Sequence, residues 1–121
     1  MKTIVVVDDE FGLVDVLAVT LADLGYQVHT ADNGKRALET MREHRPDLVI
    51  LDCMMPVLDG PGVIAAMRAD PSLAGIPVLL TSAMPEATIR TKCDGYRAFL
   101  HKPFDFDETL GQVHAVLGDA A

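Results

Sequence analysis

The sequence lacks the features of a membrane-spanning or exported protein. No apolar run approaches the ~20 consecutive residues that cross a bilayer, and the longest apolar stretches are four or five residues long. The N-terminus leads directly into the strand-like run Ile4–Val7, without the apolar region of a signal peptide. We therefore expect a soluble, cytoplasmic protein that does not bind a membrane.

Basic residues and cysteines are scarce. The 10 basic residues are outnumbered by 18 acidic ones, which leaves a formal charge of -8. Direct attachment to nucleic acid or to an anionic membrane needs a positive surface, so both are disfavoured. The two cysteines, Cys53 and Cys93, lie far apart in no metal-binding or CxxC pattern, and we expect free thiols in a reducing compartment.

The chain also lacks an internal repeat, a low-complexity tract and a linker. Its 121 residues, half of them apolar, suit one domain with a core of its own, so we expect residues 1–121 to form a single domain. The residues after Leu117 are too few for an output domain. The protein would then act alone or be one domain of a longer chain.

Strand-like runs alternate with segments of helical period, as in a parallel sheet covered by helices on both faces. We expect helices at about Glu10–Leu24, Gly34–Glu43, Pro61–Ala69 and Asp105–Leu117, with Leu24 and Phe106 on the packed faces. The predicted strands are Ile4–Val7, Gln27–Ala31, Leu48–Leu51, Val78–Leu80 and Ala98–Leu100.

The composition of the strands predicts their order in the sheet. The first, third and fourth are continuously apolar, as expected of strands buried on both faces, whereas the second alternates and the fifth is short. This favours a doubly wound, flavodoxin-like α/β fold with five parallel strands in the order 2-1-3-4-5. Ligands of such sheets bind beyond the carboxyl ends of the strands, between strands one and three.

Polar side chains follow the strands at that edge. Asp8 and Asp9 follow the first strand and Asp52 the third, whereas Thr81 follows the fourth and Lys102 the fifth. Three converging carboxylates repel one another and require a cation. Mg2+ prefers oxygen ligands and commonly holds phosphate oxygens as well, so we expect a magnesium site rather than a zinc site. A carboxylate beside Mg2+ is a potential nucleophile toward phosphorus, with Lys102 as the second cation.

The chain resembles the response-regulator receiver domains of two-component signalling over essentially its whole length. The motifs that carry the resemblance stand in the expected order: Asp8-Asp9, Asp52, Met55-Pro56, Asp59-Gly60, Thr81-Ser82 and Lys102-Pro103-Phe104. Any one of these is common by chance. Together, at the ends of the predicted strands, they are specific.

The resemblance implies a role for each site residue. Asp52 would be the phosphoacceptor, and Asp8, Asp9, Asp52 and the backbone carbonyl of Met54 would bind Mg2+. Lys102 would pair with the phosphoryl group, and its bond to Pro103 would be cis. Thr81 would bond a phosphoryl oxygen and act as a switch with Phe99. These residues are spread over four of the five predicted strand ends.

The resemblance also implies the partners. The phosphoryl group would come from a phosphohistidine on a sensor histidine kinase or a phosphotransfer protein. A downstream protein would bind the surface formed by the fourth helix, the fifth strand and the fifth helix, and the protein would be a monomer or a phosphorylation-dependent dimer. Apart from its own phosphotransfer and dephosphorylation, no enzymatic activity is implied.

One region departs from the family pattern. The stretch from Thr81 to Lys102 is about one residue short, and Tyr96 stands where the family usually has a small residue. Pro85 and three β-branched residues give the fourth helix a modest propensity, so we expect it to be short, shifted or mobile.

Less specific interpretations remain for individual residues. Asp8 and Asp9 could only cap a helix, and Ser82 is interpreted as structural. Met54 and Met55 are more typical of packing than of a soft metal site. Two other functions are a scaffold that partners bind regardless of phosphate and a phosphatase of the haloacid-dehalogenase type. The phosphatase is disfavoured because Asp52 is not followed by the second carboxylate of an Asp-x-Asp motif.

Overall fold

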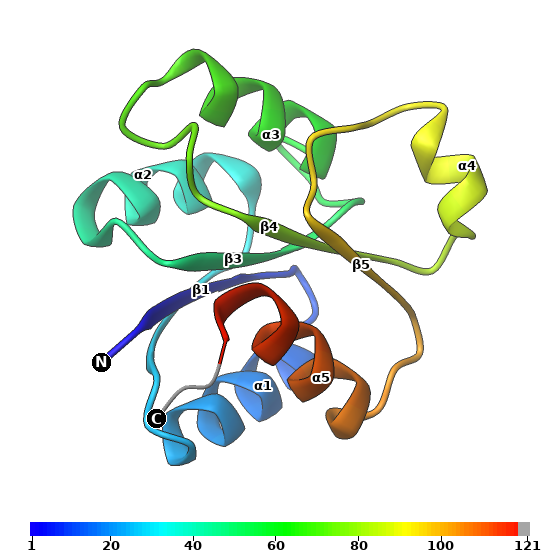
Figure 1. Ribbon diagram of the computed structural model, residues 1–121. Helices are drawn as coiled ribbons and strands as arrows, with labels where there is room; N and C mark the ends of the chain where they lie inside the picture. Colours follow the sequence, from blue (N-terminus) through cyan, green and yellow to red (C-terminus); the bar gives the residue numbers. More distant parts are fainter. Residues whose placement is uncertain (119–121) are drawn as a thin grey trace.

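The computed structural model describes residues 1–118, in which five strands alternate with five helices (Figure 1). Asp119–Ala121, part of the segment judged too short for an output domain, lie outside the described residues. Within residues 1–118 no helix is both long and apolar enough to cross a membrane. The elements are β1 (Thr3–Val7), α1 (Phe11–Asp23), β2 (Gln27–Ala31), α2 (Gly34–His44), β3 (Leu48–Asp52), α3 (Gly60–Ala69), β4 (Val78–Ser82), α4 (Glu86–Arg90), β5 (Ala98–His101) and α5 (Phe106–Leu117).

The five strands form one parallel sheet in the order β2-β1-β3-β4-β5, which confirms the predicted fold and strand order. β3 and β4 are buried at every position, whereas β2 and β5 lie at the edges and are partly exposed. The two strands on either side of the predicted switch point pair in register, with Val7 opposite Leu51. The residues that follow them therefore emerge together.

Helices cover both faces of the sheet (Figure 1). Alternate strand residues point to opposite faces, so each strand contributes to two cores. Val5, Val49 and Leu80 belong to the core beneath α2, α3 and α4. Ile4, Ile50 and Leu79 belong to the core shared with α1 and α5. The face on which a strand residue lies follows from its position in this alternation.

The helix ends differ from the sequence prediction at two apolar residues. α1 ends at Asp23, and Gly25 follows with a φ of 99°, a conformation that favours glycine. Leu24 has left helical geometry as the C-cap and is 47% exposed, so its predicted place on the packed stripe is wrong. Phe106, at the first position of α5 next to its Asp105 cap, is also partly exposed, at 37%. Helical periodicity therefore fails at both helix ends.

The fourth helix is short, as the sequence predicts. α4 comprises five residues, Glu86–Arg90, and its N-cap, Pro85, makes no side-chain capping hydrogen bond. Ile89 is the buried residue of this helix. A helix of little more than one turn is anchored by this single apolar contact and by its polar side chains.

Two histidines stack beside the edge strand β2. The rings of His29 and His44, the last residue of α2, lie parallel with centroids 3.5 Å apart. His29 Nε2 is buried without a hydrogen-bond partner among the described residues. Burial lowers the pKa of His29, and the neighbouring His44 lowers it further, although the carboxylate of Glu43 acts in the opposite direction. The folded protein therefore favours neutral His29.

We predict that the stacked pair weakens the fold in mild acid. Because the pKa of His29 is lower in the folded protein than in the unfolded chain, the unfolded chain binds more protons as pH falls below about 6.5. The free energy of unfolding of wild type relative to His29→Gln should therefore fall from pH 7.5 to pH 5, as measured by urea denaturation. The variant His44→Gln removes the contribution of His44 to the lowered pKa of His29, so it should lose part of this pH dependence. A stability difference between wild type and His29→Gln that does not change with pH would contradict the prediction.

Candidate functional site

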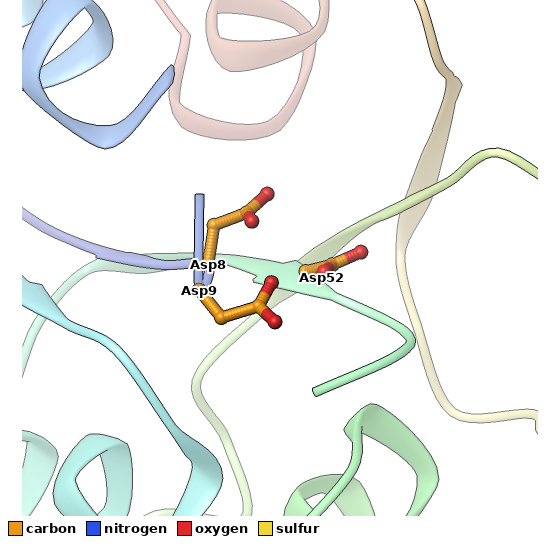
Figure 2. Close-up of side chains that lie close together, drawn as sticks. All are labelled: Asp8, Asp9 and Asp52. Atoms are coloured by element: carbon orange, nitrogen blue, oxygen red, sulfur yellow. The ribbon is translucent and has the colours of Figure 1, made fainter. Parts of the chain in front are cut away.

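The ends of β1 and β3 bring three carboxylates together. Asp8 and Asp9 follow β1, and Asp52 is the last residue of β3. One oxygen from each carboxylate lies within 4.8 Å of the others (Figure 2). Asp8 and Asp52 are buried, whereas Asp9 is exposed to solvent. The structure thus confirms the predicted convergence at the switch point.

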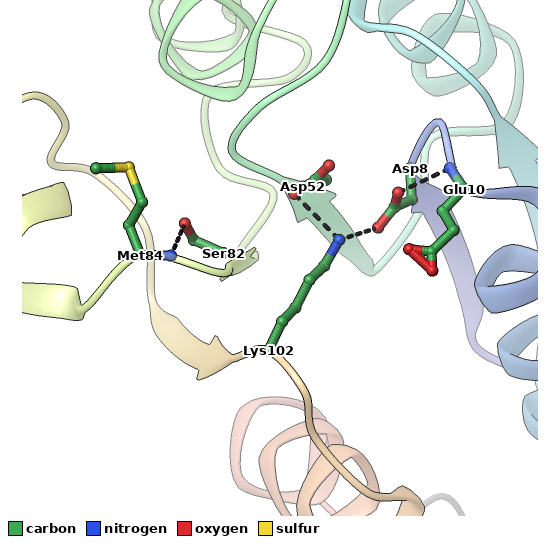
Figure 3. Close-up of polar contacts among 6 residues, drawn as sticks. All are labelled: Asp8, Glu10, Asp52, Ser82, Met84 and Lys102. Atoms are coloured by element: carbon green, nitrogen blue, oxygen red, sulfur yellow. Dashed lines mark hydrogen bonds and ion pairs between the residues drawn. The ribbon is translucent and has the colours of Figure 1, made fainter.

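Lys102 reaches the cluster from the end of β5. Its Nζ lies 2.8 Å from Asp8 Oδ2 and 3.4 Å from Asp52 Oδ1 (Figure 3). The other oxygen of Asp8 accepts a hydrogen bond of 2.9 Å from the backbone N–H of Glu10. The ammonium therefore bridges two carboxylates that come from different strands.

Close backbone packing holds the end of β3 in place. A Cβ atom on Gly60 would lie 2.8 Å from Cys53 Cα, so only glycine fits without a shift of the backbone. The Gly60 N–H donates to the Cys53 carbonyl at 2.9 Å, and Asp59 caps α3 by accepting from the Gly62 N–H. The Asp59-Gly60 motif therefore positions the loop that follows Asp52. Just after β5, the peptide bond between Lys102 and Pro103 is cis, as expected.

Burial and charge leave Asp52 poorly stabilised as an anion. Burial raises the pKa of Asp52, the carboxylate of Asp8 raises it further, and Lys102 only partly opposes them, so that the pKa is about 6. Burial alone would lower the pKa of Lys102, but the hydrogen bond to Asp8 and the charge of Asp52 prevail and raise it. Lys102 therefore stays charged while the cluster keeps an excess of negative charge.

This donor set suits a hard divalent cation. The cluster offers carboxylate oxygens from Asp8, Asp9 and Asp52, and the exposed Asp9 leaves room for water, which Mg2+ usually retains. The backbone N–H of Met54 stabilises the Asp52 carboxylate and lowers its pKa. The backbone carbonyl of Met54 as a further metal ligand stays a prediction.

The two hydroxyls at the end of β4 lie on opposite faces of the sheet. Leu79 belongs to the core shared with α1 and α5, and Thr81 follows it in alternation. Leu80 belongs to the other core, so Ser82 lies on the α2, α3 and α4 face. Thr81 pairs in register with Asp52, whereas Ser82 pairs with His101.

This placement separates the two residues of the predicted switch, Thr81 and Phe99. Leu80 pairs with Phe99, and Phe99 packs against the core beneath α2, α3 and α4. Ser82 shares that face with Phe99, whereas Thr81 pairs with Leu100 and lies on the other face. Thr81 and Phe99 therefore lie on opposite faces of the sheet, and the roles of Thr81 as a phosphoryl ligand and as a switch stay predictions. Alternation within either strand alone does not distinguish Thr81 from Ser82, because the choice follows from the register between β4 and β5.

The order of the strands and the acidic cluster with its lysine define a class of CheY-like α/β domains with a flavodoxin-like fold. Residues 4–114 match the model of the response regulator receiver domain, and the chain belongs to this family.

Curated and solved relatives support this assignment. The chain is 35% identical to the DNA-binding dual master transcriptional regulator RpaA of Synechocystis, over 97% of this chain and 49% of that protein. The receiver domain of a sensor histidine kinase from Pseudomonas aeruginosa has a TM-score of 0.88 at 28% identity, covers 98% of both chains and was crystallised with magnesium in its active-site cleft. TrrA from Thermotoga maritima, in complex with Mg(2+)-BeF, has a TM-score of 0.84 at 32% identity, with 96% of this chain and 99% of that one covered.

The chain spans about half the length of the curated relatives that it matches. RpaA, and MtrA of Mycolicibacterium paratuberculosis at 34% identity, are both described as DNA-binding. The expectation that the protein has no nucleic-acid partner is therefore not supported, although the charge of -8 still disfavours DNA contact by these residues.

We predict that Asp52→Asn stabilises the metal-free protein. The substitution removes a buried charge whose pKa is about 6, and this shift corresponds to a gain on the order of 2 kcal/mol at pH 7. Because the folded pKa lies above the unfolded value, protonation stabilises wild type as pH falls through about 6. The difference between variant and wild type should therefore shrink toward pH 4.5 in urea denaturation.

Saturating Mg2+ provides the control for this prediction. Mg2+ should stabilise wild type by mass action and affect Asp52→Asn much less. A metal-free variant that is less stable than wild type at pH 7 would contradict the repulsion that the structure shows.

Proposed function

We propose that this chain is a phosphoacceptor receiver that takes a phosphoryl group on Asp52 from a phosphohistidine. The observation that carries the proposal is the position of Lys102 Nζ, within 3.4 Å of both Asp8 and the buried Asp52. A lysine that only neutralised one carboxylate would need a single partner. This one stands where incoming phosphoryl oxygens would need a positive charge.

The transfer requires little covalent assistance. An oxygen of the Asp52 carboxylate forms a bond to phosphorus while the phosphorus–nitrogen bond of the donor histidine breaks, and the imidazole leaves with the electron pair. Lys102 is placed to exchange its contact with Asp52 for one with a phosphoryl oxygen. The Lys102 ammonium donates a hydrogen bond of 2.8 Å to Asp8 Oδ2, and this contact would keep the ammonium at the site during the exchange. Bound Mg2+, held by Asp8, Asp9 and Asp52, would neutralise charge on the transferring group.

A chain of contacts supports a proposed route from the site to a partner surface. Ser82 Oγ accepts a hydrogen bond from the Met84 N–H at 3.0 Å, and its own O–H is left to donate to a phosphoryl oxygen. Phe99 lies on the same face of the sheet, and its ring centroid is 6.1 Å from that of Tyr96. Tyr96 donates to Glu86 on α4 at 3.0 Å. We propose that movement of Ser82 reaches α4 through these aromatic side chains.

The proposed partner surface comprises α4, β5 and α5, and its ligand is a downstream protein. A five-residue α4 held by few contacts is the element of this surface that moves at the least cost. The donor is a sensor histidine kinase or a phosphotransfer protein, and the setting is cytoplasmic.

We predict that acetyl phosphate with Mg2+ adds one phosphoryl group to wild type, because Asp52 is the buried nucleophile beside Lys102. Intact-mass spectrometry should show the addition in wild type and in the control Asp107→Asn, which alters an exposed carboxylate on α5. Asp52→Asn should show none, and Lys102→Ala should accept the group at least about tenfold more slowly. Wild type that stays unmodified at millimolar donor would favour the scaffold interpretation.

We predict that Ser82, rather than Thr81, carries the switch. Beryllofluoride with Mg2+ should shift the NMR signals of Tyr96 and Phe99 in wild type and in Thr81→Val. Of the two hydroxyl residues at the end of β4, Ser82 is the one that shares a face of the sheet with Phe99. Ser82→Ala should bind beryllofluoride while its aromatic signals stay near those of the free protein. The opposite result, with the response lost in Thr81→Val and kept in Ser82→Ala, would restore Thr81 as the switch.

A further inference from the structure

An open groove crosses the edge of the sheet at the carboxyl end of β2. Its volume is about 950 Å³. Helix α1 lies on one face of the sheet and α2 on the other (Figure 1). Residues of both helices line the groove together with Thr30 and Ala31, the last residues of β2. The groove therefore lies over the open side of an edge strand.

The open side of β2 presents peptide groups that have no strand partner. Within residues 1–118, β2 pairs with β1 alone. The Gln27 N–H donates to the Lys2 carbonyl, and the Ala31 carbonyl accepts from the Asp8 N–H, so both face β1. Because alternate residues direct their peptide groups to opposite sides of a strand, those of Thr30 point into the open edge. An extended segment in the groove can therefore bond to Thr30 as a neighbouring strand would.

The groove is acidic on balance. Its lining contains five carboxylates against one lysine and one arginine. The arginine, Arg36, is already paired with Asp32 at 3.9 Å. Asp15 and Glu39 are exposed, and no ion pair joins either of them to another residue of the described chain. The charge of the groove therefore complements a basic partner.

Two exposed apolar side chains also line the groove. Phe11, the first residue of α1, is 72% exposed, and Val57, in the loop after β3, is 77% exposed. Val57 has a φ of 72°, and the Leu58 N–H donates across it to the Pro56 carbonyl at 2.8 Å. A β-branched residue rarely adopts this conformation. The turn thus presents an apolar side chain to solvent, where a partner can contact it.

We propose that this groove binds an extended, basic segment of a partner protein, which adds beside Thr30 as a further short strand. Basic side chains of the segment meet Asp15 and Glu39, and an apolar one contacts Phe11 and Val57. A second copy of this chain is disfavoured, because it carries the same acidic groove and a net charge of -8. Since β2 and β5 are opposite edges of the sheet, a protein on the α4, β5 and α5 surface leaves the groove accessible.

The test is an NMR titration of the isotope-labelled full chain with a capped heptapeptide that alternates arginine and valine. Saturating Mg2+ keeps the peptide from the acidic cluster. The backbone signals of Thr30 and Glu39 should shift in a saturable way, those of Phe99 should not, and affinity should fall as salt is added. A peptide N-methylated at alternate residues lacks half of the N–H donors and should bind at least about threefold more weakly.

Matched variants separate the groove from general charge effects. Asp15→Asn with Glu39→Gln should weaken binding about fivefold. Asp23→Asn with Asp107→Asn changes the net charge equally at exposed residues outside the groove, and should bind like wild type. Val57→Gly removes an apolar contact and should also weaken binding. Its thermal stability should be kept, because glycine suits a φ of 72°.

Four results would overturn the proposal. These are equal binding by the two double variants, shifts confined to α4, β5 and α5, undiminished binding of the N-methylated peptide, and absence of any saturable shift. Competition by spermidine at the affinity of the peptide would also overturn it, because it would show a general polycation site. The titration uses unphosphorylated protein, so each outcome is independent of phosphotransfer to Asp52.

Discussion

The repulsion between Asp8 and Asp52 is the constraint on which the site depends. Both carboxylates are buried at the end of the sheet, and one ammonium lies between them at 2.8 and 3.4 Å. One lysine cannot neutralise two buried anions and the adjacent Asp9, so the site stays electrostatically unsatisfied. A site with this excess of charge favours a divalent cation and responds strongly when a phosphoryl group alters the balance.

The fold supplies the rigid frame that this repulsion needs. β3 is buried at all five positions and pairs with strands on both sides, so the carboxylate at its end cannot retreat into solvent. Gly60 closes the loop against Cys53 with no space for a side chain. The shortest helix, the five-residue α4, lies farther along the chain after β4. One strand, β4, therefore joins the rigid end of the sheet to this short helix.

The sequence predicted the features that depend on local pattern. Continuous apolar runs identified the central strands, and the polar residues after them identified Asp8, Asp52 and Lys102 as neighbours. Residues at the margins of elements were harder to predict, because helical periodicity ends where the helix does, as at Leu24. The choice between Thr81 and Ser82 depends on the register with β5, which is set by pairing between strands rather than by local composition.

Strand alternation finally explains how two kinds of chemistry occupy adjacent residues. Asp52 joins the oxygen cluster at the end of the sheet, whereas the next side chain, Cys53, enters the core beneath α3 and α4. The same alternation on β4 assigns Thr81 and Ser82 to opposite faces. The sheet itself therefore separates the oxygen cluster from the apolar core, and neighbouring side chains of one strand serve the site and the packing at the same time.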